Sequence, residues 1–474
     1  MKSKQTKIVA TVSDKRCSTG FIQNLYDKGV DAIRLNTAHQ SVDDTLKVVQ
    51  HGREVSDKIA FIVDTKGPEI RTSKSDMAIH VEKGNEIKFS NRFDNRNTEE
   101  VINVSYANFV AEVPVGSKIL IDDGDVEFEV VAKDSIFLYC VALNSGQVGS
   151  KKSVNVPGVH IYMSSLTDKD IEYINFCCDN EIDYIAHSFV RRKQDVLDIK
   201  DILARRGNSV TKVIAKIENQ EGVDNIEDIL EVADGVMVAR GDLAIEVPAW
   251  EVPIIQKRII EKSIRKAKFV ITATQMLHTM IKNPRPTRAE INDVANAVFD
   301  GSDAVMLSGE TAYGDYPVES VEIMSKIIRN VEFNRKNYTK TESTIWHDPV
   351  QRFIAKTAID ALQELPIKVI VCVTKNGFTA RLLSSYRPGV PIFARCISKH
   401  TMRHLALEYG VIPSYIEDFS DYNSMLTESL CNMLERNLIQ EDDLILMVGT
   451  SQSCDLHNEF IEIKTAKEHF ILNQ

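Results

Sequence analysis

The feature that most constrains the fold is a series of short, β-branched segments, each followed by a longer segment with helical periodicity. Several are apolar throughout, which is typical of parallel strands covered on both faces. Eight parallel strands that alternate with helices predict an α/β protein built on a closed (β/α)8 TIM barrel. The predicted strands are TKIVATV (6–12), DAIRLN (31–36), IAFIVD (59–64), DYIAHS (183–188), KVIAKIE (212–218), DGVMVA (234–239), KFVITAT (268–274) and DAVMLS (303–308).

One interval, between the third and fourth predicted strands, is much longer than the others. It holds the alternating segments EIKFS, KILIDDGDVEFEVVAKD and SIFLYCVAL, separated by Gly and Asn turns. Alternation with few helical patterns predicts a small all-β lid domain inserted in a barrel loop. We place this domain at 72–156, which leaves residues 1–71 and 157–345 for the barrel.

After residue 345 the alternation of helix and strand begins again. A helix is predicted over 349–364 and another over 378–386, with strands over 367–373, 391–396 and 443–449. The pattern is typical of an open α/β sheet rather than a continuation of the barrel. We therefore predict a separate C-terminal α/β domain over 346–474, a candidate for oligomerisation and for an effector site.

The composition limits which binding partners and which cellular compartment are expected for this chain. A formal net charge of −11 disfavours a nucleic acid as partner, since the nucleic acid is itself a polyanion. The eight cysteines form no CxxC pair, as is usual in a reducing cytoplasm. The apolar run after the basic N-terminus is too short for a signal peptide, and no stretch approaches the ~20 apolar residues of a membrane span. We expect a cytoplasmic protein without a membrane partner.

Polar residues close several of the predicted strands, where a (β/α)8 barrel has its active site. Lys216 and Glu218 are two residues apart on a strand and so point to the same face. Glu218 and Asp242, on neighbouring strands, could together hold a hard divalent cation such as Mg²⁺. Lys216 beside them could neutralise a phosphoryl group during its transfer, a reaction that depends mainly on positioning and charge.

Each of these residues also has a structural explanation. Lys216 and Glu218 could form a simple ion pair, and Asp64 in DTKG could be a turn residue. Charged groups at most strand ends, however, would be costly without a ligand. The chain has no GxxxxGK[ST] loop and no GxGxxG after a strand, so a bound nucleotide would be held by other groups.

Long motifs carry a resemblance to one family. They are, in chain order, TKIVATV, RLNTAH, DTKGPEIRT, AKIENQEGVDNI, MVARGDLAIE, ATQML, NPRPTRAEINDVANAVFDG and MLSGETAYGDYPVE. Through them, residues 6–330 closely resemble pyruvate kinase, and the likeness continues more loosely through the third domain. The resemblance implies Mg²⁺-dependent transfer of the phosphoryl group of phosphoenolpyruvate to ADP, giving pyruvate and ATP in the last step of glycolysis. It also implies a homotetramer.

The resemblance further implies roles for residues of the predicted mouth. Lys216, assisted by Arg34, matches the cation that stabilises the transferring phosphoryl group, and Glu218 and Asp242 match the ligands of the catalytic Mg²⁺. Thr274 matches the group near the enolate carbon, in a network that delivers a proton through water.

Other matching positions concern the substrate carboxylate, a monovalent cation and the nucleotide. The backbone of Gly241 and Asp242 opens a short helix that would receive the carboxylate. Asn36, Asp64 and Thr65 match the K⁺ site. The nucleotide-side positions are Arg34, Asn36, His39, Arg71 and Lys152, with Lys152 reaching in from the inserted domain.

Three departures from the family pattern bear on function. Ala38 stands where the family usually has a Ser whose hydroxyl helps to hold K⁺, although Glu69 is typical of K⁺-dependent members. The first strand continues into Ser13-Asp14-Lys15 instead of a GPAS-like turn beside the nucleotide. In the third domain the Gly-rich effector loop is reduced to 449–455, so a sugar-phosphate activator is not implied.

Two other readings are compatible with these departures. A Mg²⁺-dependent lyase or aldolase acting on pyruvate enolate would use the same mouth carboxylates, but it has no need of Arg71 and Lys152. A catalytically impaired regulatory paralogue would tolerate Ala38, but it would not need to keep Lys216 and the metal pair. The resemblance favours the active kinase over both.

Overall fold

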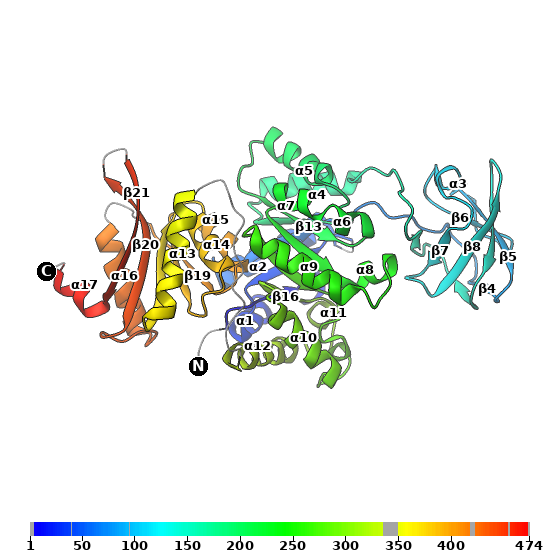
Figure 1. The fold of residues 1–474 in the computed structure, drawn as a ribbon. Helices are drawn as coiled ribbons and strands as arrows, with labels where there is room; N and C mark the ends of the chain where they lie inside the picture. The colour runs from blue at the N-terminus through cyan, green and yellow to red at the C-terminus, as the bar shows by residue number, and fades with distance from the viewer. Residues whose placement is uncertain are drawn as a thin grey trace.

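The computed structural model describes residues 4–38, 40–93, 95–334, 349–417, 422–453 and 456–472. A barrel lies between a β domain, which projects from one side, and a C-terminal α/β domain on the other side (Figure 1). The barrel with an inserted β domain and a third α/β domain confirms the predicted fold class. None of the described helices combines the length and the apolarity needed to cross a membrane.

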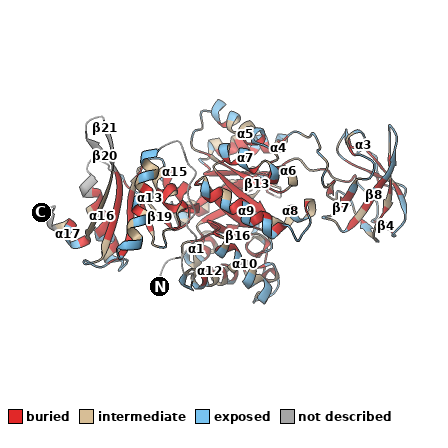
Figure 2. Ribbon diagram, viewed as in Figure 1, coloured by how far each residue is buried: buried red, intermediate tan, exposed pale blue. Residues whose placement is uncertain are grey.

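Eight parallel strands close the barrel in the order β1-β16-β15-β14-β13-β12-β3-β2. All eight lie within the predicted segments. Their side chains are buried almost without exception, as Figure 2 shows at the centre of the molecule, because helices cover the barrel wall. The strands are β1 Lys7–Thr11, β2 Ala32–Asn36, β3 Ala60–Asp64, β12 Tyr184–His187, β13 Lys212–Ile217, β14 Gly235–Ala239, β15 Phe269–Ala273 and β16 Ala304–Leu307.

The barrel helices begin with local sequence signals. Ser41, Thr167 and Thr287 each form a capping box with an acidic residue three positions later, which satisfies backbone N–H groups at the helix start. The helices are α1 Thr19–Lys28, α2 Val42–Val55, α4 Asp168–Asp179, α5 Lys193–Arg205, α6 Gln220–Asp224, α7 Ile226–Val232, α8 Arg240–Glu246, α9 Val252–Arg265, α10 Arg288–Asp300, α11 Gly309–Ala312 and α12 Pro317–Asn334, with 3₁₀ turns at Asp14–Arg16 and His278–Ile281.

An aspartate stands directly before every second barrel strand, namely before β2, β12, β14 and β16. In each case one carboxylate oxygen accepts the backbone N–H of a residue on the preceding strand, at 2.8–3.0 Å. These contacts tie neighbouring strands at the amino end of the barrel. The pairs are Asp31 with Ile8, Asp183 with Phe61, Asp234 with Val213, and Asp303 with Val270.

The inserted domain has a six-stranded sheet in the order β11-β7-β8-β9-β5-β6 and a separate pair, β10 and β4. Its core is a cluster of its own, centred on Phe89, Phe109 and Phe128. The elements are β4 Ile79–Val81, β5 Glu86–Ser90, β6 Val101–Asn103, α3 Phe109–Glu112, β7 Lys118–Ile121, β8 Val126–Lys133, β9 Leu138–Ala142, β10 Gly146–Val148 and β11 Val154–Asn155.

One buried carboxylate binds both the segment where the chain leaves the barrel for the inserted domain and the segment where it returns. Asp170 lies on α4, just after the chain returns. Its Oδ1 accepts the backbone N–H groups of Lys66 at 2.9 Å and Gly67 at 3.3 Å, where the chain leaves β3. Its Oδ2 accepts the N–H and the hydroxyl of Thr167, at 2.9 Å and 2.7 Å.

The C-terminal domain is a five-stranded sheet in the order β19-β18-β17-β20-β21, parallel except for β21. The predicted strands correspond to β17, β18 and β20, whereas β19 and β21 were not predicted. The elements are α13 Pro349–Glu364, β17 Ile367–Thr374, α14 Phe378–Ser385, β18 Ile392–Cys396, α15 Lys399–His404, a 3₁₀ turn Leu405–Leu407, β19 Val411–Tyr415, α16 Tyr422–Glu435, β20 Leu444–Ser453, β21 Leu456–Thr465 and α17 Ala466–Leu472.

The C-terminal domain packs against the amino end of the barrel through buried ion pairs. Arg387 donates to Asp303 at 2.9 Å and Arg403 to Asp183 at 2.5 Å. Leu407 and Ala406 join Tyr184 and other inward-facing barrel residues in one apolar cluster. The opposite, carboxyl end of the barrel is therefore the end left free for a site.

Candidate active site at the barrel mouth

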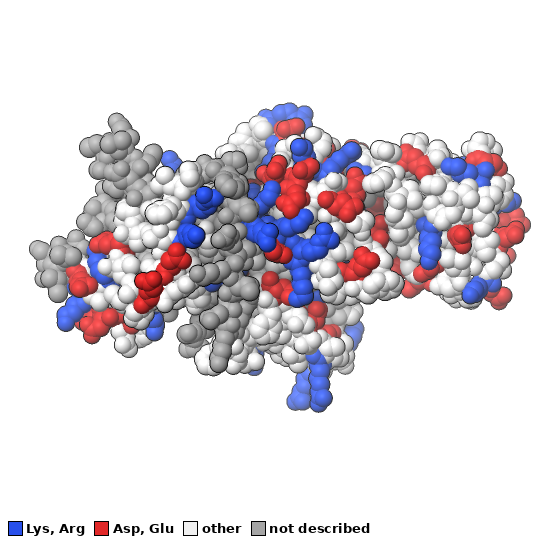
Figure 3. Space-filling view, in the orientation of Figure 1, with Lys and Arg blue, Asp and Glu red and all other residues white. Residues whose placement is uncertain are grey.

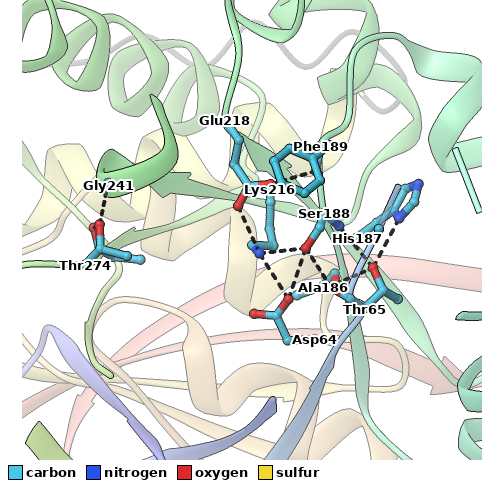
Figure 4. A network of polar contacts seen from close by, with 12 residues as sticks. Asp64, Thr65, Ala186, His187, Ser188, Phe189, Lys216, Glu218, Gly241 and Thr274 are labelled. Carbon is cyan, nitrogen blue, oxygen red and sulfur yellow. Dashed lines mark hydrogen bonds and ion pairs between the residues drawn. The ribbon is translucent and has the colours of Figure 1, made fainter. Parts of the chain in front are cut away.

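Lys216 lies at the centre of the barrel mouth, near the end of β13 (Figure 4). Its ammonium lies 2.9 Å from Glu218 Oε1 and donates to Asp64 Oδ1 at 3.1 Å and to Ser188 Oγ at 2.7 Å. Burial opposes the charge of Lys216, but the Asp64 and Glu218 carboxylates outweigh it and raise the pKa of Lys216 above its ordinary value. The ammonium is thus a fixed positive charge in a largely buried position.

The Glu218 carboxylate is buried, and only one of its two oxygens accepts a hydrogen bond of normal geometry. Its Oε2 accepts the backbone N–H of Phe189 at 2.6 Å, whereas Oε1 has its ion pair with Lys216 but accepts no hydrogen bond of normal geometry. Burial raises the pKa of Glu218, Lys216 acts in the opposite direction, and the nearby Asp242 carboxylate raises it further. A buried carboxylate oxygen that lacks donors, beside a second carboxylate, fits the oxygen ligands of Mg²⁺.

Two protein carboxylates would leave most positions around a cation to water or substrate. Across the described part of the chain, no group of three or more His, Cys, Asp and Glu side chains forms a ready-made metal cage. Mg²⁺ usually keeps several waters and takes only one or two protein carboxylates. Glu218 and Asp242 therefore fit a magnesium site that the substrate completes.

Arg34 and Asp64 form a second buried pair beside Lys216. The Arg34 Nε donates to Asp64 Oδ2 at 2.5 Å, and its Nη1 donates to Thr11 Oγ1 at 3.3 Å. Burial opposes the charge of Asp64, yet Arg34 and Lys216 together lower the pKa of Asp64. Two cations thus converge on one carboxylate, and both guanidinium and ammonium face the same region of the mouth.

The residues expected around K⁺ cluster close to this pair. Thr65 is buried, and its hydroxyl lies 3.4 Å from His187 Nδ1 and 3.1 Å from the backbone N of Ser188. Asn36 lies at the end of β2, opposite Asp64 in the strand pairing. The Oδ1 atom of Asn36 accepts the backbone N–H of Ala38 at 3.2 Å, so Ala38 contributes its main chain but no hydroxyl.

Thr274 and Gly241 lie together on the other side of the mouth (Figure 4). The Gly241 N–H donates to Thr274 Oγ1 at 2.7 Å, and this hydroxyl donates to the Ala273 carbonyl at 2.7 Å. Thr274 has φ +68°, a left-handed conformation that costs a β-branched residue about 1–3 kcal/mol. Arg240 stabilises it by donating to the Thr274 carbonyl at 2.7 Å while it binds Asp293 through both terminal nitrogens.

The nucleotide-side residues are less closely grouped. Arg71 lies where the inserted domain begins and pairs with Glu69 at 2.7 Å, while Lys152 pairs with Asp122 within that domain. Neither contacts the Lys216 cluster in this structure. His39 lies outside the described residues.

Two contributors to the mouth were missed from the sequence. Ser188 donates to the Thr65 carbonyl at 2.7 Å and accepts from Lys216, so its hydroxyl orients the ammonium. Phe189 contributes only its backbone N–H, from a left-handed residue with φ +56°. Ser188 follows a predicted strand and could have been considered on that ground, but a main-chain donor leaves no signal in the sequence.

Comparison of the sequence with known proteins matches one family along nearly the whole chain. Residues 3–321 match the family model described as pyruvate kinase, barrel domain, and residues 352–459 match the model described as pyruvate kinase, alpha/beta domain. A pyruvate kinase of Borreliella burgdorferi is 45% identical over 472 residues, covering 99% of this chain and 98% of that protein. One of Staphylococcus haemolyticus is 42% identical and covers 96% of this chain and 80% of that protein.

A solved structure gives the same result in three dimensions. The crystal structure of a pyruvate kinase from Cryptosporidium parvum superimposes with a TM-score of 0.90 at 33% sequence identity. The match covers 98% of this chain and 96% of that one, so it includes all three domains. Together with the family models and the relatives, it shows that this chain belongs to the pyruvate kinase family.

Proposed function

We propose that the chain is an active enzyme that transfers the phosphoryl group of phosphoenolpyruvate to ADP, giving pyruvate and ATP. The observation that carries this proposal is the Lys216 ammonium, which is buried between Asp64 and Glu218 and stays charged. Phosphoryl transfer needs fixed positive charge where the transferring oxygens pass, in a site from which water is excluded. The same charge would be hard to explain as packing alone.

In this proposal, Lys216 and Arg34 neutralise the phosphoryl group as it moves. Both cations are already fixed by Asp64, so little reorganisation is needed when the substrate binds. Glu218 and Asp242 would hold Mg²⁺, which would supply further positive charge to the site. Ser188 keeps the ammonium aligned as a positioning residue.

The carboxylate of the substrate binds at the start of α8, on the backbone N–H groups of Gly241 and Asp242. The Gly241 N–H now donates to Thr274, so the substrate would replace that acceptor and release the hydroxyl. A released Thr274 hydroxyl is then free to orient a water that gives the proton to the enolate carbon. We therefore assign Thr274 to proton delivery.

Asn36, Asp64 and Thr65 would hold K⁺, and Ala38 supplies no hydroxyl to this site. The expected consequence is a weak requirement for K⁺ rather than none. The nucleotide binds near Arg34, Asn36 and His39 and is approached by Arg71 and Lys152 when the inserted domain closes. Both of these cations have carboxylate partners now, which the phosphates of ADP would displace.

The domain boundaries, the oligomeric state and the cellular location are also proposals. We divide the chain into a barrel at 1–71 and 157–345, a lid at 72–156 and a C-terminal domain at 346–474; the boundary near 345 falls outside the described residues. We also propose a cytoplasmic homotetramer that interacts with neither membranes nor nucleic acid. The formal net charge of −11 disfavours nucleic acid. On the face that Figure 3 shows, basic side chains lie among acidic ones, and Lys262 on α9 lies 2.9 Å from Glu227.

The test is pyruvate formation from phosphoenolpyruvate with Mg²⁺, measured with and without ADP and with and without K⁺. We expect turnover that requires ADP and increases modestly with K⁺. Reaction without ADP would indicate a lyase or aldolase instead. Folded protein without turnover under any of these conditions would indicate a regulatory paralogue and would refute the proposal.

A further inference from the structure

Two segments join the inserted domain to the barrel, and beyond the barrel they pair with each other. Arg71 lies opposite Ser153 in an antiparallel bridge, and a backbone N–H on each segment donates to a carbonyl of the other at 2.8 Å. We call these paired segments, residues 70–73 and 151–155, the ribbon. The two cations assigned to the nucleotide, Arg71 and Lys152, both lie on this ribbon.

Between the ribbon and the barrel, the returning chain passes through Pro157 and Gly158. Gly158 has φ +75°, a conformation that favours glycine, and no described atom outside the neighbouring residues lies within 4 Å of the place that a Cβ would take. Three residues later the chain is held by the barrel, because Arg191 donates to the Ile161 and Met163 carbonyls at 2.8 Å each. A rotation about Pro157 and Gly158 would therefore move the ribbon while the barrel stays in place.

A side-chain hydrogen bond ties the base of the ribbon to α8. Asn155, the last residue of the ribbon, donates through Nδ2 to Glu246 Oε1 at 2.9 Å. Glu246 is the last residue of α8, and the same helix carries Gly241 and Asp242 in its first turn. The contact therefore links the segment that carries the nucleotide-side cations to the helix that carries the groups assigned to the other substrate and to Mg²⁺.

The helix α8 is a rigid support for this contact. Leu243 within it and Val247 directly after it are buried in the barrel core. Arg240, its first residue, binds both carboxylate oxygens of Asp293 at 2.7 Å. Because α8 is fixed at both ends, the barrel sets the position of Glu246, and Glu246 sets the position of Asn155.

The Glu246 carboxylate is an unusual choice for a contact that only packs two segments together. Burial raises the pKa of Glu246, the hydrogen bond from Asn155 acts in the opposite direction, and no described cation adds to it. A desolvated carboxylate without a cation is costly, so an apolar or amide side chain would pack there more favourably. A carboxylate does, however, accept a shorter and stronger hydrogen bond than a neutral group, which holds its donor more firmly.

We propose that Glu246 is a positioning residue for the nucleotide. By holding Asn155 it fixes the point about which the ribbon turns, so that the two ribbon cations reach the same place each time the inserted domain closes. The inference rests on the proposed function, since it takes ADP as the second substrate. Asn155 is only three residues from Lys152, and a misplacement of about 1 Å in a positioned group can cost about a hundredfold in rate.

The experiment compares Glu246→Ala with Glu246→Gln in the full chain, with ADP varied at saturating phosphoenolpyruvate and Mg²⁺. Glu246→Ala should lower kcat/KM for ADP about tenfold, the equivalent of one charge-assisted hydrogen bond. Glu246→Gln keeps an acceptor oxygen for Asn155 and should recover most of this loss. Binding of phosphoenolpyruvate, titrated calorimetrically with Mg²⁺ and without ADP, should be the same in all three proteins, because the start of α8 is not altered.

His160→Ala is the matched control. The Nδ1 atom of His160 lies 3.0 Å from Glu221 Oε2 on α6, so this side chain also joins the return segment to the barrel. It lies on the barrel side of Gly158, however, next to the carbonyls that Arg191 holds. Its loss should leave kcat/KM for ADP unchanged.

Amide hydrogen exchange gives a measurement that does not depend on turnover. The backbone amides of residues 151–155 should exchange faster in Glu246→Ala than in the unchanged chain or in Glu246→Gln. Asn155→Ala should reproduce both the kinetic and the exchange effects, and the double variant should be no worse than either single one if the two side chains act through one contact. Asn155→Ala also makes the test if Glu246→Ala does not fold.

Failure of this inference and failure of the proposed function give different results. If the unchanged chain turns over ADP and Glu246→Ala has the same kcat/KM for ADP, the inference is wrong and the proposed function stands. An equal loss of phosphoenolpyruvate binding in Glu246→Ala would mean that Glu246 supports the whole mouth, and would also overturn the inference. If the unchanged chain has no turnover, the proposed function is refuted, and an unchanged exchange rate at 151–155 would overturn the positioning contact as well.

Discussion

The two ends of the barrel both contain buried charges, but they satisfy them differently. At the amino end, every oxygen of Asp183 and Asp303 accepts at least one hydrogen bond from an Arg or a backbone N–H. At the mouth, Glu218 Oε1 has only an ion pair of poor hydrogen-bond geometry, and Lys216 is shared among three oxygens. A buried carboxylate whose oxygens all accept hydrogen bonds is typical of a structural contact, and a buried carboxylate oxygen without a donor is typical of a site that awaits a ligand.

The largest expected effect is at the mouth. Lys216→Met should reduce the rate of phosphoryl transfer at least about a thousandfold, because loss of a preorganised charge that stabilises a transition state costs several kcal/mol. Enolate protonation, measured as exchange of pyruvate methyl protons with solvent, should be partly retained. Lys212→Met, at the opposite end of the same strand, is the matched control and should keep most activity. Transfer within tenfold of the unchanged chain would remove Lys216 from its proposed role.

The next largest expected effect is a loss of folding stability, caused by a substitution at the amino end of the barrel. Asp303→Asn removes the carboxylate that pairs with the buried Arg387 and should lower the free energy of unfolding by about 3–5 kcal/mol, with kcat little changed at temperatures where the protein is folded. Urea unfolding measures the loss. Asp315→Asn, which breaks an exposed pair with Lys282, should cost less than about 1 kcal/mol. Similar losses in both variants would contradict the contrast between buried and exposed pairs.

Glu218→Gln tests the unsatisfied oxygen directly. We expect the Mg²⁺ concentration for half-maximal activity to rise at least about tenfold, by analogy with the 10–100-fold cost of disturbing a metal's supporting groups. Glu221→Gln, three residues further along the chain, should leave the Mg²⁺ titration unchanged. Coincident titrations for Glu218→Gln and the unchanged chain would rule out Glu218 as a ligand.

The amino end should also lose stability in acid. Burial lowers the pKa of His404 to about 4 in the folded chain, whereas its ordinary value is 6.5. As the pH falls below 6.5 the unfolded chain therefore takes up the proton first, and stability is lost between about pH 6.5 and 4. Linkage puts the loss by pH 5 at about 2 kcal/mol. His404→Phe should remove this part of the pH dependence, measured by urea unfolding at pH 7.5 and 5; an unaltered slope would assign the acid sensitivity to other groups.

The smallest expected effect is that of substituting Ala38, one of the residues that depart from the family pattern. Ala38→Ser should place a hydroxyl near Asn36 and lower the K⁺ concentration for half-maximal activity a few-fold. One added ligand contact is worth ~1 kcal/mol, which corresponds to a change of this size. Activity titrated with K⁺ at saturating substrates measures it. No change would mean that water already completes the site or that K⁺ does not bind there.

The contrast also explains what the sequence could and could not predict. The barrel strands were predictable because they are short, mostly apolar segments, each followed by a helical pattern, and the mouth residues because they lie at or near the ends of these segments. The aspartates before alternate strands were equally visible in the sequence, yet their partners Arg387 and Arg403 lie far along the chain in another domain. Only tertiary packing brings them together. Strand β19 was missed because Val411–Tyr415 contains a Pro and is not apolar throughout.

The Asp170 carboxylate has a further consequence for how the chain could have acquired its inserted domain. By binding Lys66 and Gly67 at the exit and Thr167 at the return, it holds together the two ends of a loop of about a hundred residues. The entropy of closing a loop grows only slowly with its length, so a junction that is already closed makes the barrel nearly indifferent to what the loop contains. Such a junction is a natural position for grafting: domains of other sizes could be exchanged there while the barrel folds as before.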